Sequence, residues 1–298
     1  MVVPRHTGRK CPARFPASSG TSSKHRRWIG TLAIAATLVH AGCGSRGSAT
    51  TAPSPTPSAA QSWSDEFDGP AGALPSAAKW TYDLGGGGWG NQELETYTSA
   101  PANVHLDGSG HLVIHVDKTD SGYTSARLKT QGLFAAHYGR VEARIKLPSG
   151  QGIWPAFWML GADFPSTPWP QCGEIDIMEN VGREPSVNHG SVHGPGYSGG
   201  NAVSRTYTLP GGAAFSDDFH VFAIDWAPQS IAFTVDGNVY QTIKPGSLPA
   251  GAAWVFDKPF FMILNVAVGG TFPGNPNGTT TFPQEMIVDY VRVTGSSP

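Results

Sequence analysis

The chain after residue 62 is divided by Gly and Pro into short segments, and no long segment keeps the 3.6-residue apolar period of a helix. The 298 residues include 38 Gly and 25 Pro, so turn-forming residues recur every few positions. Between them lie runs rich in β-branched and aromatic residues, as is typical of strands. Many short strands separated by turns predict a β-sandwich or barrel. The clearest runs are His111–Val116, Tyr138–Leu147, Phe219–Trp226, Ser230–Val235, Phe260–Val268 and Met286–Val293.

The dipeptide Asp236-Gly237 separates two apolar runs and predicts a tight β-hairpin. The segment 63–298 is long enough to bury one large shared core, so we expect a single all-β domain there. A long polymer would bind such a domain from the side, in a shallow cleft across one curved sheet.

The first 62 residues differ in charge from the rest. They carry eight Lys or Arg and no acid, whereas the remainder carries 12 basic and 22 acidic residues, a formal charge of −10. Nucleic acids and sulfated polymers require a basic surface, so we expect neither as a partner. A neutral polymer fits this balance better.

Residues 1–42 resemble an export signal, because a basic stretch precedes an apolar run over 28–41. That run is too short to span a bilayer comfortably. Residues 43–62 are rich in Ser, Thr, Pro and Ala, which predicts a linker.

Gly42-Cys43 resembles a bacterial lipoprotein cleavage site, which would leave a lipid anchor at Cys43. His40 stands where such sites usually carry an apolar residue, so plain secretion is the alternative. We therefore expect an exported protein, either secreted or anchored on the outer face of a bacterial membrane.

Cys11 and Cys43 belong to the predicted export segment, so Cys172 is the single thiol of the domain. No disulfide framework is expected. Cys172 lies beside a row of acids and could be a nucleophile, but no paired His motif supports this role. A buried packing residue is the preferred interpretation.

Three carboxylates lie within six residues of a predicted strand, Glu174, Asp176 and Glu179. Glu174 and Asp176 share one face of the strand, because successive side chains alternate. Glu179 has the wrong parity, but a β-bulge with Met178 as the extra residue would return it to that face. The sequence thus predicts a row of three acids facing one cleft.

Such a row suits hydrolysis of a glycosidic bond, which needs one ionised and one protonated carboxyl group. Glu174 is the candidate nucleophile and Glu179 the candidate general acid and base. Asp176 would separate the pKa values of the other two, because close like charges cannot all ionise freely. The alternative is that the three acids are ordinary residues of a solvated strand face.

The segment Gly173-Glu174-Ile175-Asp176-Ile177-Met178-Glu179 resembles the active-site signature of glycoside hydrolase family 16, in its laminarinase-like branch. The resemblance extends over nearly all of the chain after residue 62. It implies a β-jelly-roll sandwich of two curved antiparallel sheets with a substrate cleft on the concave face, and a retaining endo-glucanase. The other segments that carry it are 63–67, 88–94, 152–158, 264–270 and 288–293.

Several residues are candidates for binding sugar. Trp154 and Trp158 share one strand face while Phe157 points to the other, so both indoles can stack on sugar rings. The position of Trp158 matches an aromatic platform of the family. The resemblance also makes Glu142 and Arg144 cleft residues, with an exposed ion pair of little energetic worth as the alternative.

Three further cleft candidates are Asn91, His193 and Asn265. Asn91 matches the family's loop over the non-reducing side of the cleft, and His193 matches its cleft histidine near the scissile bond. Asn265 lies in a predicted strand, where a buried amide needs partners that sugar hydroxyls could supply.

No cofactor is expected for catalysis, and no His or Cys spacing predicts a metal site. The resemblance implies a structural calcium held by Asp289 and by backbone carbonyls near Glu66 and Gly110. Oxygen ligands suit calcium.

These observations predict a monomeric, exported endo-β-1,3-glucanase whose partner is a β-glucan such as laminarin. A mixed-linkage β-1,3-1,4-glucanase is one alternative, and another polysaccharide hydrolase of the same fold is a second. A non-catalytic β-glucan-binding protein is the alternative from a different class. Such relatives typically lack one of the two Glu residues, whereas Glu174 and Glu179 are both present.

Overall fold

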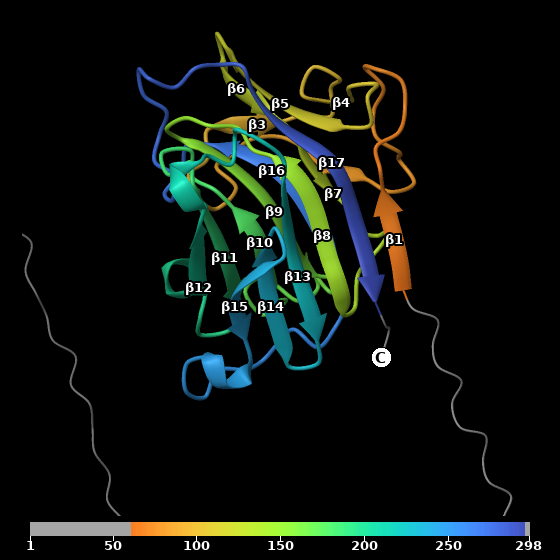
Figure 1. Ribbon diagram of the computed structural model, residues 1–298. Coiled ribbons are helices and arrows are strands. Elements are labelled where there is room, and N and C mark those ends of the chain that lie inside the picture. The colour runs from red at the N-terminus through yellow and green to blue at the C-terminus, as the bar shows by residue number, and fades with distance from the viewer. Residues whose placement is uncertain (1–60, 296–298) are drawn as a thin grey trace, which may run out of the picture. The chain divides into compact units, whose positions relative to one another are not determined.

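The computed structural model describes residues 61–295, and Figure 1 shows two curved β-sheets packed face to face. One sheet has ten strands: β1 Gln61–Asp65, β3 Glu95–Tyr97, β4 Val104–Leu106, β5 Leu112–Thr119, β6 Gly122–Ser125, β8 Gly139–Lys146, β13 His220–Ala227, β14 Ser230–Val235, β15 Asn238–Ile243 and β17 Gln284–Gly295. The other has seven: β2 Thr81–Asp83, β7 Arg127–Lys129, β9 Ile153–Gly161, β10 Glu174–Glu179, β11 Val187–His193, β12 Val203–Thr208 and β16 Phe260–Val268. Three short 3₁₀ turns complete the described elements: η1 Gly199–Asn201, η2 Pro210–Gly212 and η3 Pro245–Ser247.

The strand order confirms the predicted two-sheet sandwich. The ten-stranded sheet runs β15-β14-β13-β8-β17-β5-β6-β3, with β1 beside β17 and β4 beside β5. The seven-stranded sheet runs β12-β11-β10-β9-β16-β7-β2. Among the described strands, all pairings are antiparallel except that of β3 with β6. The sheets are therefore built mainly from returns of the chain and not from helical crossovers.

The six runs predicted from the sequence correspond to β5, β8, β13, β14, β16 and β17. The predicted hairpin joins β14 to β15, and its two central residues, Asp236 and Gly237, have φ values of 49° and 76°. A type I′ turn requires positive φ at both positions, which explains this Asp-Gly pair. The first strand, β1, begins at Gln61, two residues before the expected start of the domain at residue 63, because its pairing with the end of β17 includes residues 61 and 62.

The core lies between the two sheets and follows the alternation of the strands. In β8, Val141, Ala143 and Ile145 are buried at that interface. All nine residues of β16 are buried, because one face packs in the core while the other is the floor of a cleft. Each large side chain buried in this way contributes about 1.5–3 kcal/mol of hydrophobic stabilisation.

Cys172 is fully buried and has no disulfide partner, which confirms the packing interpretation. Burial raises the pKa of its thiol to about 11, so the thiolate that a nucleophile requires is strongly disfavoured. The predicted export signal, the lipid anchor at Cys43 and nearly all of the predicted linker lie outside the described residues. Within 61–295, no helix has the length and apolar character needed to cross a membrane.

Candidate active site

A cleft with a volume of about 890 Å³ crosses the seven-stranded sheet on the face turned away from the core. All seven strands of that sheet contribute lining residues. This volume is at the upper end of the range for ligand sites, as a long ligand would require. The Asp and Glu residues that line the cleft are Asp83, Glu93, Glu174, Asp176 and Glu179, and the lining Lys and Arg residues are Arg127 and Lys129.

The acids of β10 reach this cleft because the strand contains a bulge. Asp176 pairs with Trp158 of β9, while Met178 pairs with the next residue, Phe157. Ile177 is therefore the extra residue, one position before the Met178 expected from the sequence. Ile177 and Met178 are both buried in the core, which restores Glu179 to the cleft face.

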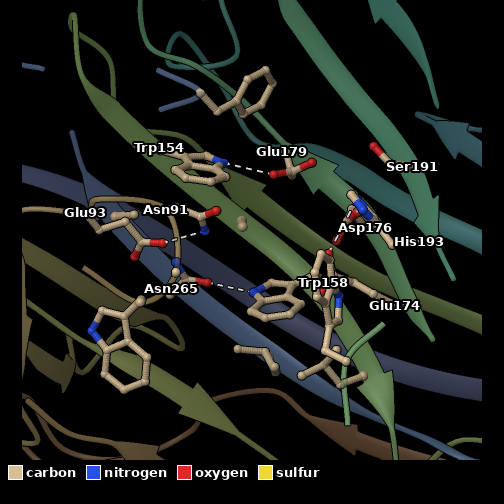
Figure 2. A pocket seen from close by; sticks show the side chains of 18 of the residues that line it. Asn91, Glu93, Trp154, Trp158, Glu174, Asp176, Glu179, Ser191, His193 and Asn265 are labelled. Atoms are coloured by element: carbon tan, nitrogen blue, oxygen red, sulfur yellow. Dashed lines mark hydrogen bonds and ion pairs between the residues drawn. The ribbon is translucent and has the colours of Figure 1, made fainter. Parts of the chain in front are cut away.

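Neighbouring strands place side chains side by side across the cleft. Asp176 lies opposite Trp158 of β9 and Ser191 of β11, and Glu174 lies opposite His193. The acid row thus follows one strand, and a ligand lying across the strands would meet each neighbour in turn. Figure 2 shows the residues that lie on the two sides of this row. Asn91, Glu93 and Asn265 lie on one side, and Ser191 and His193 lie on the other.

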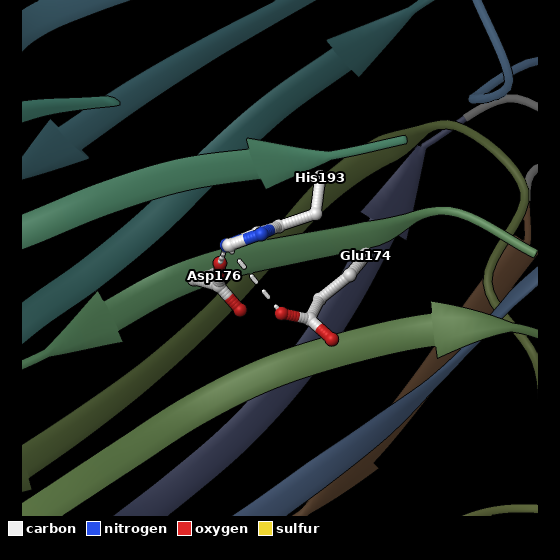
Figure 3. Close-up of side chains that lie close together, drawn as sticks. All are labelled: Glu174, Asp176 and His193. Carbon is white, nitrogen blue, oxygen red and sulfur yellow. Dashed lines mark ion pairs between the residues drawn. The ribbon is translucent and has the colours of Figure 1, made fainter. Parts of the chain in front are cut away.

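His193 holds two of the acids together (Figure 3). Its Nδ1 accepts the backbone N–H of Gly199 at 3.1 Å, so the ring proton resides on Nε2. Nε2 lies 3.0 Å from Asp176 Oδ2, without the alignment of a hydrogen bond, and 3.5 Å from Glu174 Oε1. His193 therefore presents an N–H group to both carboxylates.

Burial at the cleft floor raises the pKa of every acid in the row. The pKa values of Asp176 and Glu179 rise to about 8, and that of Glu174 also rises, with the charge of Asp176 as the next cause. His193 has the opposite effect and lowers the pKa values of Glu174 and Glu179. At neutral pH the row therefore holds fewer than three negative charges.

Among residues 61–295, the only group of three or more His, Cys, Asp or Glu close enough to share a metal ion is Glu174, Asp176 and His193, whose ligand atoms lie within 4.8 Å of one another. A metal would need a lone pair on Nε2 of His193. That atom carries the proton, because Gly199 donates to Nδ1. The arrangement thus places an N–H group beside the carboxylates, where a metal ion would need a lone pair.

Two tryptophans of β9 line the cleft as predicted, and each donates a hydrogen bond to a polar residue of the site. The indole of Trp154 donates to Glu179 Oε1 at 3.0 Å. The indole of Trp158 donates to Asn265 Oδ1 at 2.7 Å. We expected the amide of Asn265 to form its hydrogen bonds with sugar hydroxyls. In the structure it accepts a hydrogen bond from Trp158 and donates one to Tyr97, so protein groups occupy part of its hydrogen-bonding capacity.

The predicted positions of Glu142 and Arg144 in the cleft were wrong. Both belong to β8 of the ten-stranded sheet, and neither lines the cleft. Glu142 accepts a hydrogen bond from Arg140 at 2.7 Å, and Arg144 donates to Asp289 at 2.6 Å. Glu142 and Arg144 also do not pair with each other, as the alternative of one exposed ion pair supposed. Parity in a strand identifies a face but not the sheet that carries it.

Arg127 is a cleft residue that sequence reasoning missed. Its guanidinium lies between two indoles, 5.0 Å from the ring centre of Trp89 and 4.7 Å from that of Trp158. Asp83 pairs with it at 3.0 Å. Arg127 belongs to a strand of only three residues that carries no motif. Its position in the cleft therefore follows only from the pairing of that strand with its neighbours. Other lining residues that were missed are Trp169, His189, Ser191, Ser204 and Phe272.

The residues predicted to hold calcium have other partners in the structure. A Cβ built on Gly110 would lie 4.0 Å from the Glu66 carbonyl oxygen, so these two backbones are close. The Glu66 carboxylate accepts two hydrogen bonds from Arg292, at 2.9 and 2.6 Å. One oxygen of Asp289 accepts from Arg144. Arg144 thus occupies one of the two carboxylate oxygens that Asp289 could offer to a metal ion.

Together, a row of carboxyl groups with raised pKa values, an aromatic cleft and a β-sandwich define the class of this protein as a glycoside hydrolase. The sequence model of glycosyl hydrolases family 16 matches residues 91–292, and the chain belongs to this family.

Known proteins with similar sequences and structures agree with this assignment. A β-glucanase of Rhodothermus marinus is 45% identical over 241 residues, which cover 78% of this chain and 83% of that protein. The endo-β-1,3-glucanase of Pyrococcus furiosus is 50% identical, with a TM-score of 0.74 over 79% of this chain and 94% of its own. The laminarinase catalytic domain of Thermotoga maritima is 45% identical, with a TM-score of 0.75 over 80% and 99%.

Proposed function

We propose that this protein hydrolyses internal β-1,3-glucosidic bonds of laminarin-like β-glucans, with retention of anomeric configuration. The observation that carries the proposal is the bulge in β10, which aligns Glu174, Asp176 and Glu179 in one cleft. The endo-β-1,3-glucanase and the laminarinase domain described above support the choice of linkage, because they share at least 45% identity with this chain.

Glu174 is the proposed nucleophile. Its carboxylate attacks the anomeric carbon, the bond to the leaving oxygen breaks, and Glu179 transfers its proton to that oxygen. Glu179 then takes a proton from water, whose oxygen attacks the same carbon and releases Glu174. The raised pKa of Glu179, about 8, keeps it protonated for the first step.

The nucleophile must be ionised although burial raises its pKa. His193 and a Trp169 hydrogen bond both stabilise the charged form of Glu174. Protons on Asp176 and Glu179 would remove the nearest like charges. The first step requires the charge of the row to lie on Glu174, with a proton on Glu179.

The cleft favours a neutral polysaccharide. Two basic residues line it, Arg127 and Lys129. Both pair with Asp83, at 3.0 and 2.5 Å respectively. The five lining acids outnumber these two cations, so the cleft offers no net positive charge to a sulfate group. Sugar rings can instead stack on the exposed aromatic faces of the cleft, with Asn91 on the proposed non-reducing side.

The alternatives differ in their products. A mixed-linkage β-1,3-1,4-glucanase would prefer lichenan, and a non-catalytic glucan-binding protein would bind laminarin without cleaving it. We expect wild-type protein to release oligosaccharides from laminarin faster than from lichenan, and none from agarose. Glu174→Ala should retain binding but lose cleavage, and laminarin that stays intact with wild-type protein would refute the proposal.

A structural calcium at Glu66, Gly110 and Asp289 is also proposed, from the family resemblance. The closeness of Gly110 to the Glu66 carbonyl supports it, whereas Arg144 competes for Asp289. Calcium should raise the melting temperature of EDTA-treated protein, and this rise should be absent in Asp289→Ala. Equal melting temperatures with and without calcium would contradict the site.

We further propose that the protein is exported, as a secreted enzyme or as a lipoprotein anchored at Cys43, and that it acts as a monomer. The N-terminal sequence supports export. Mass spectrometry of the mature N-terminus distinguishes the two forms, because only the lipoprotein carries acyl chains on Cys43. Light scattering on a sizing column tests the monomer.

A further inference from the structure

Glu93 uses both carboxylate oxygens to hold neighbouring side chains beside the cleft. Oε1 accepts a hydrogen bond from Asn91 Nδ2 at 2.9 Å, and Oε2 accepts from the hydroxyl of Tyr97 at 3.2 Å. Glu93 is only 9% exposed, so water does not compete strongly for these bonds. Figure 2 shows it beside Asn91, on the same side of the acid row and farther from that row.

The hydrogen-bond chain continues from Tyr97 to the aromatic floor of the cleft. The Tyr97 hydroxyl accepts a hydrogen bond from Asn265 Nδ2 at 3.1 Å. Asn265 Oδ1 in turn accepts from the indole of Trp158 at 2.7 Å. Tyr97 and Asn265 are buried, and Trp158 lies opposite Asp176 in the sheet. Each donor and acceptor in this chain thus has a defined direction.

Glu95 is a buried neighbour of Glu93, and its pKa is raised. It is 1% exposed, and its Oε2 accepts the backbone N–H of Val268 at 2.7 Å, while its Oε1 has no partner. Burial and the charge of Glu93 raise the pKa of Glu95 to about 8. Glu95 therefore holds its proton at neutral pH beside Glu93, the residue that accepts from Asn91 and Tyr97.

We propose that Glu93 is a positioning residue for the sugar-binding side of the cleft, an inference that rests on the proposed function. It fixes the amide of Asn91 directly. It fixes the ring plane of Trp158 through Tyr97 and Asn265. Glu93 acts through these side chains and does not need to touch the sugar.

The first test uses no ligand, so it does not depend on the proposed function. Solvent exchange of the Trp158 indole proton is measured by NMR, with Trp158→Phe to assign the resonance. Glu93→Ala and Tyr97→Phe should accelerate this exchange about tenfold or more, as the loss of a charge-assisted bond predicts. Trp80, whose indole donates to Asp65 at 2.8 Å, is the internal control and should be unchanged. Unchanged protection of Trp158 in both variants would overturn the relay.

The second test is a double-mutant cycle on kcat/KM with laminarin. Glu93→Ala should reduce kcat/KM about tenfold, mainly through KM, and should have a much smaller effect when Asn91 is already Ala. Glu285→Gln, on the ten-stranded sheet, is the matched acid control and should be neutral. Additive losses would mean that Glu93 acts independently of Asn91, which would overturn the positioning of Asn91 by Glu93. If wild-type protein leaves laminarin intact, the proposed function fails, and the proton-exchange test still decides on Glu93.

Discussion

The hydrogen bond from Trp154 to Glu179 predicts a shift in pH dependence. A donor that points at a carboxylate favours its charged form, so this bond holds the pKa of Glu179 below the value that burial alone would give. Trp154→Phe removes the donor and keeps an aromatic ring near Phe272. The pKa of Glu179 should therefore rise above about 8.

The size of the shift follows from the strength of the bond. A hydrogen bond to a charged group contributes about 1.5–3 kcal/mol, and one pKa unit corresponds to about 1.4 kcal/mol. The Trp154→Phe variant should therefore move the pKa up by about one to two units. Because a general acid must be protonated to act, the alkaline limb of the kcat/KM profile should move to higher pH by that amount.

The assay is the release of reducing sugar from laminarin, measured as kcat/KM from about pH 4 to pH 10. Trp158→Phe is the matched control, since its indole donates to the uncharged amide of Asn265. That variant should lose affinity and keep its alkaline limb. If the alkaline limb of Trp154→Phe is unchanged or moves to lower pH, the assignment of this limb to Glu179 is refuted.

Three further outcomes are expected. In Glu174→Ala, azide should restore part of the activity and give an α-configured glycosyl azide by NMR; no rescue would remove the nucleophile role. Glu179→Gln should retain more activity on aryl glucosides with good leaving groups than on laminarin, and equal losses would argue against the acid role. Folded Glu95 has a pKa of about 8 against an ordinary 4.5, so between these pH values the folded state holds a proton that the unfolded state has released. The melting temperature of wild-type protein should therefore fall relative to that of Glu95→Gln as pH rises from about 4 to 8, and parallel curves would contradict the shift.

The sequence was sufficient for the fold class, for several of the strands and for the acid row. Runs of β-branched and aromatic residues identified six strands, and the parity of Glu174, Asp176 and Glu179 required a bulge that the structure contains. The extra residue was assigned to Met178 and is Ile177, because two adjacent apolar residues satisfy the same parity. Only the pairing with β9 distinguishes them.

Long-range pairing set the limit of prediction. Glu142 and Arg144 have the parity of cleft residues but lie on the other sheet, and no local pattern specifies which sheet a strand joins. Arg127 lies between two indoles that are distant in sequence. The proton position of His193 depends on a backbone N–H from the loop at Gly199, which cannot be inferred from spacing.

The most direct test of the proposed mechanism is the configuration of the first product. Proton NMR during early hydrolysis of laminarin observes the anomeric hydrogen of the newly formed reducing end before mutarotation. Attack by Glu174 followed by attack of water should give the β anomer first. An α anomer as the first product would mean a single inversion, and would contradict a covalent role for Glu174.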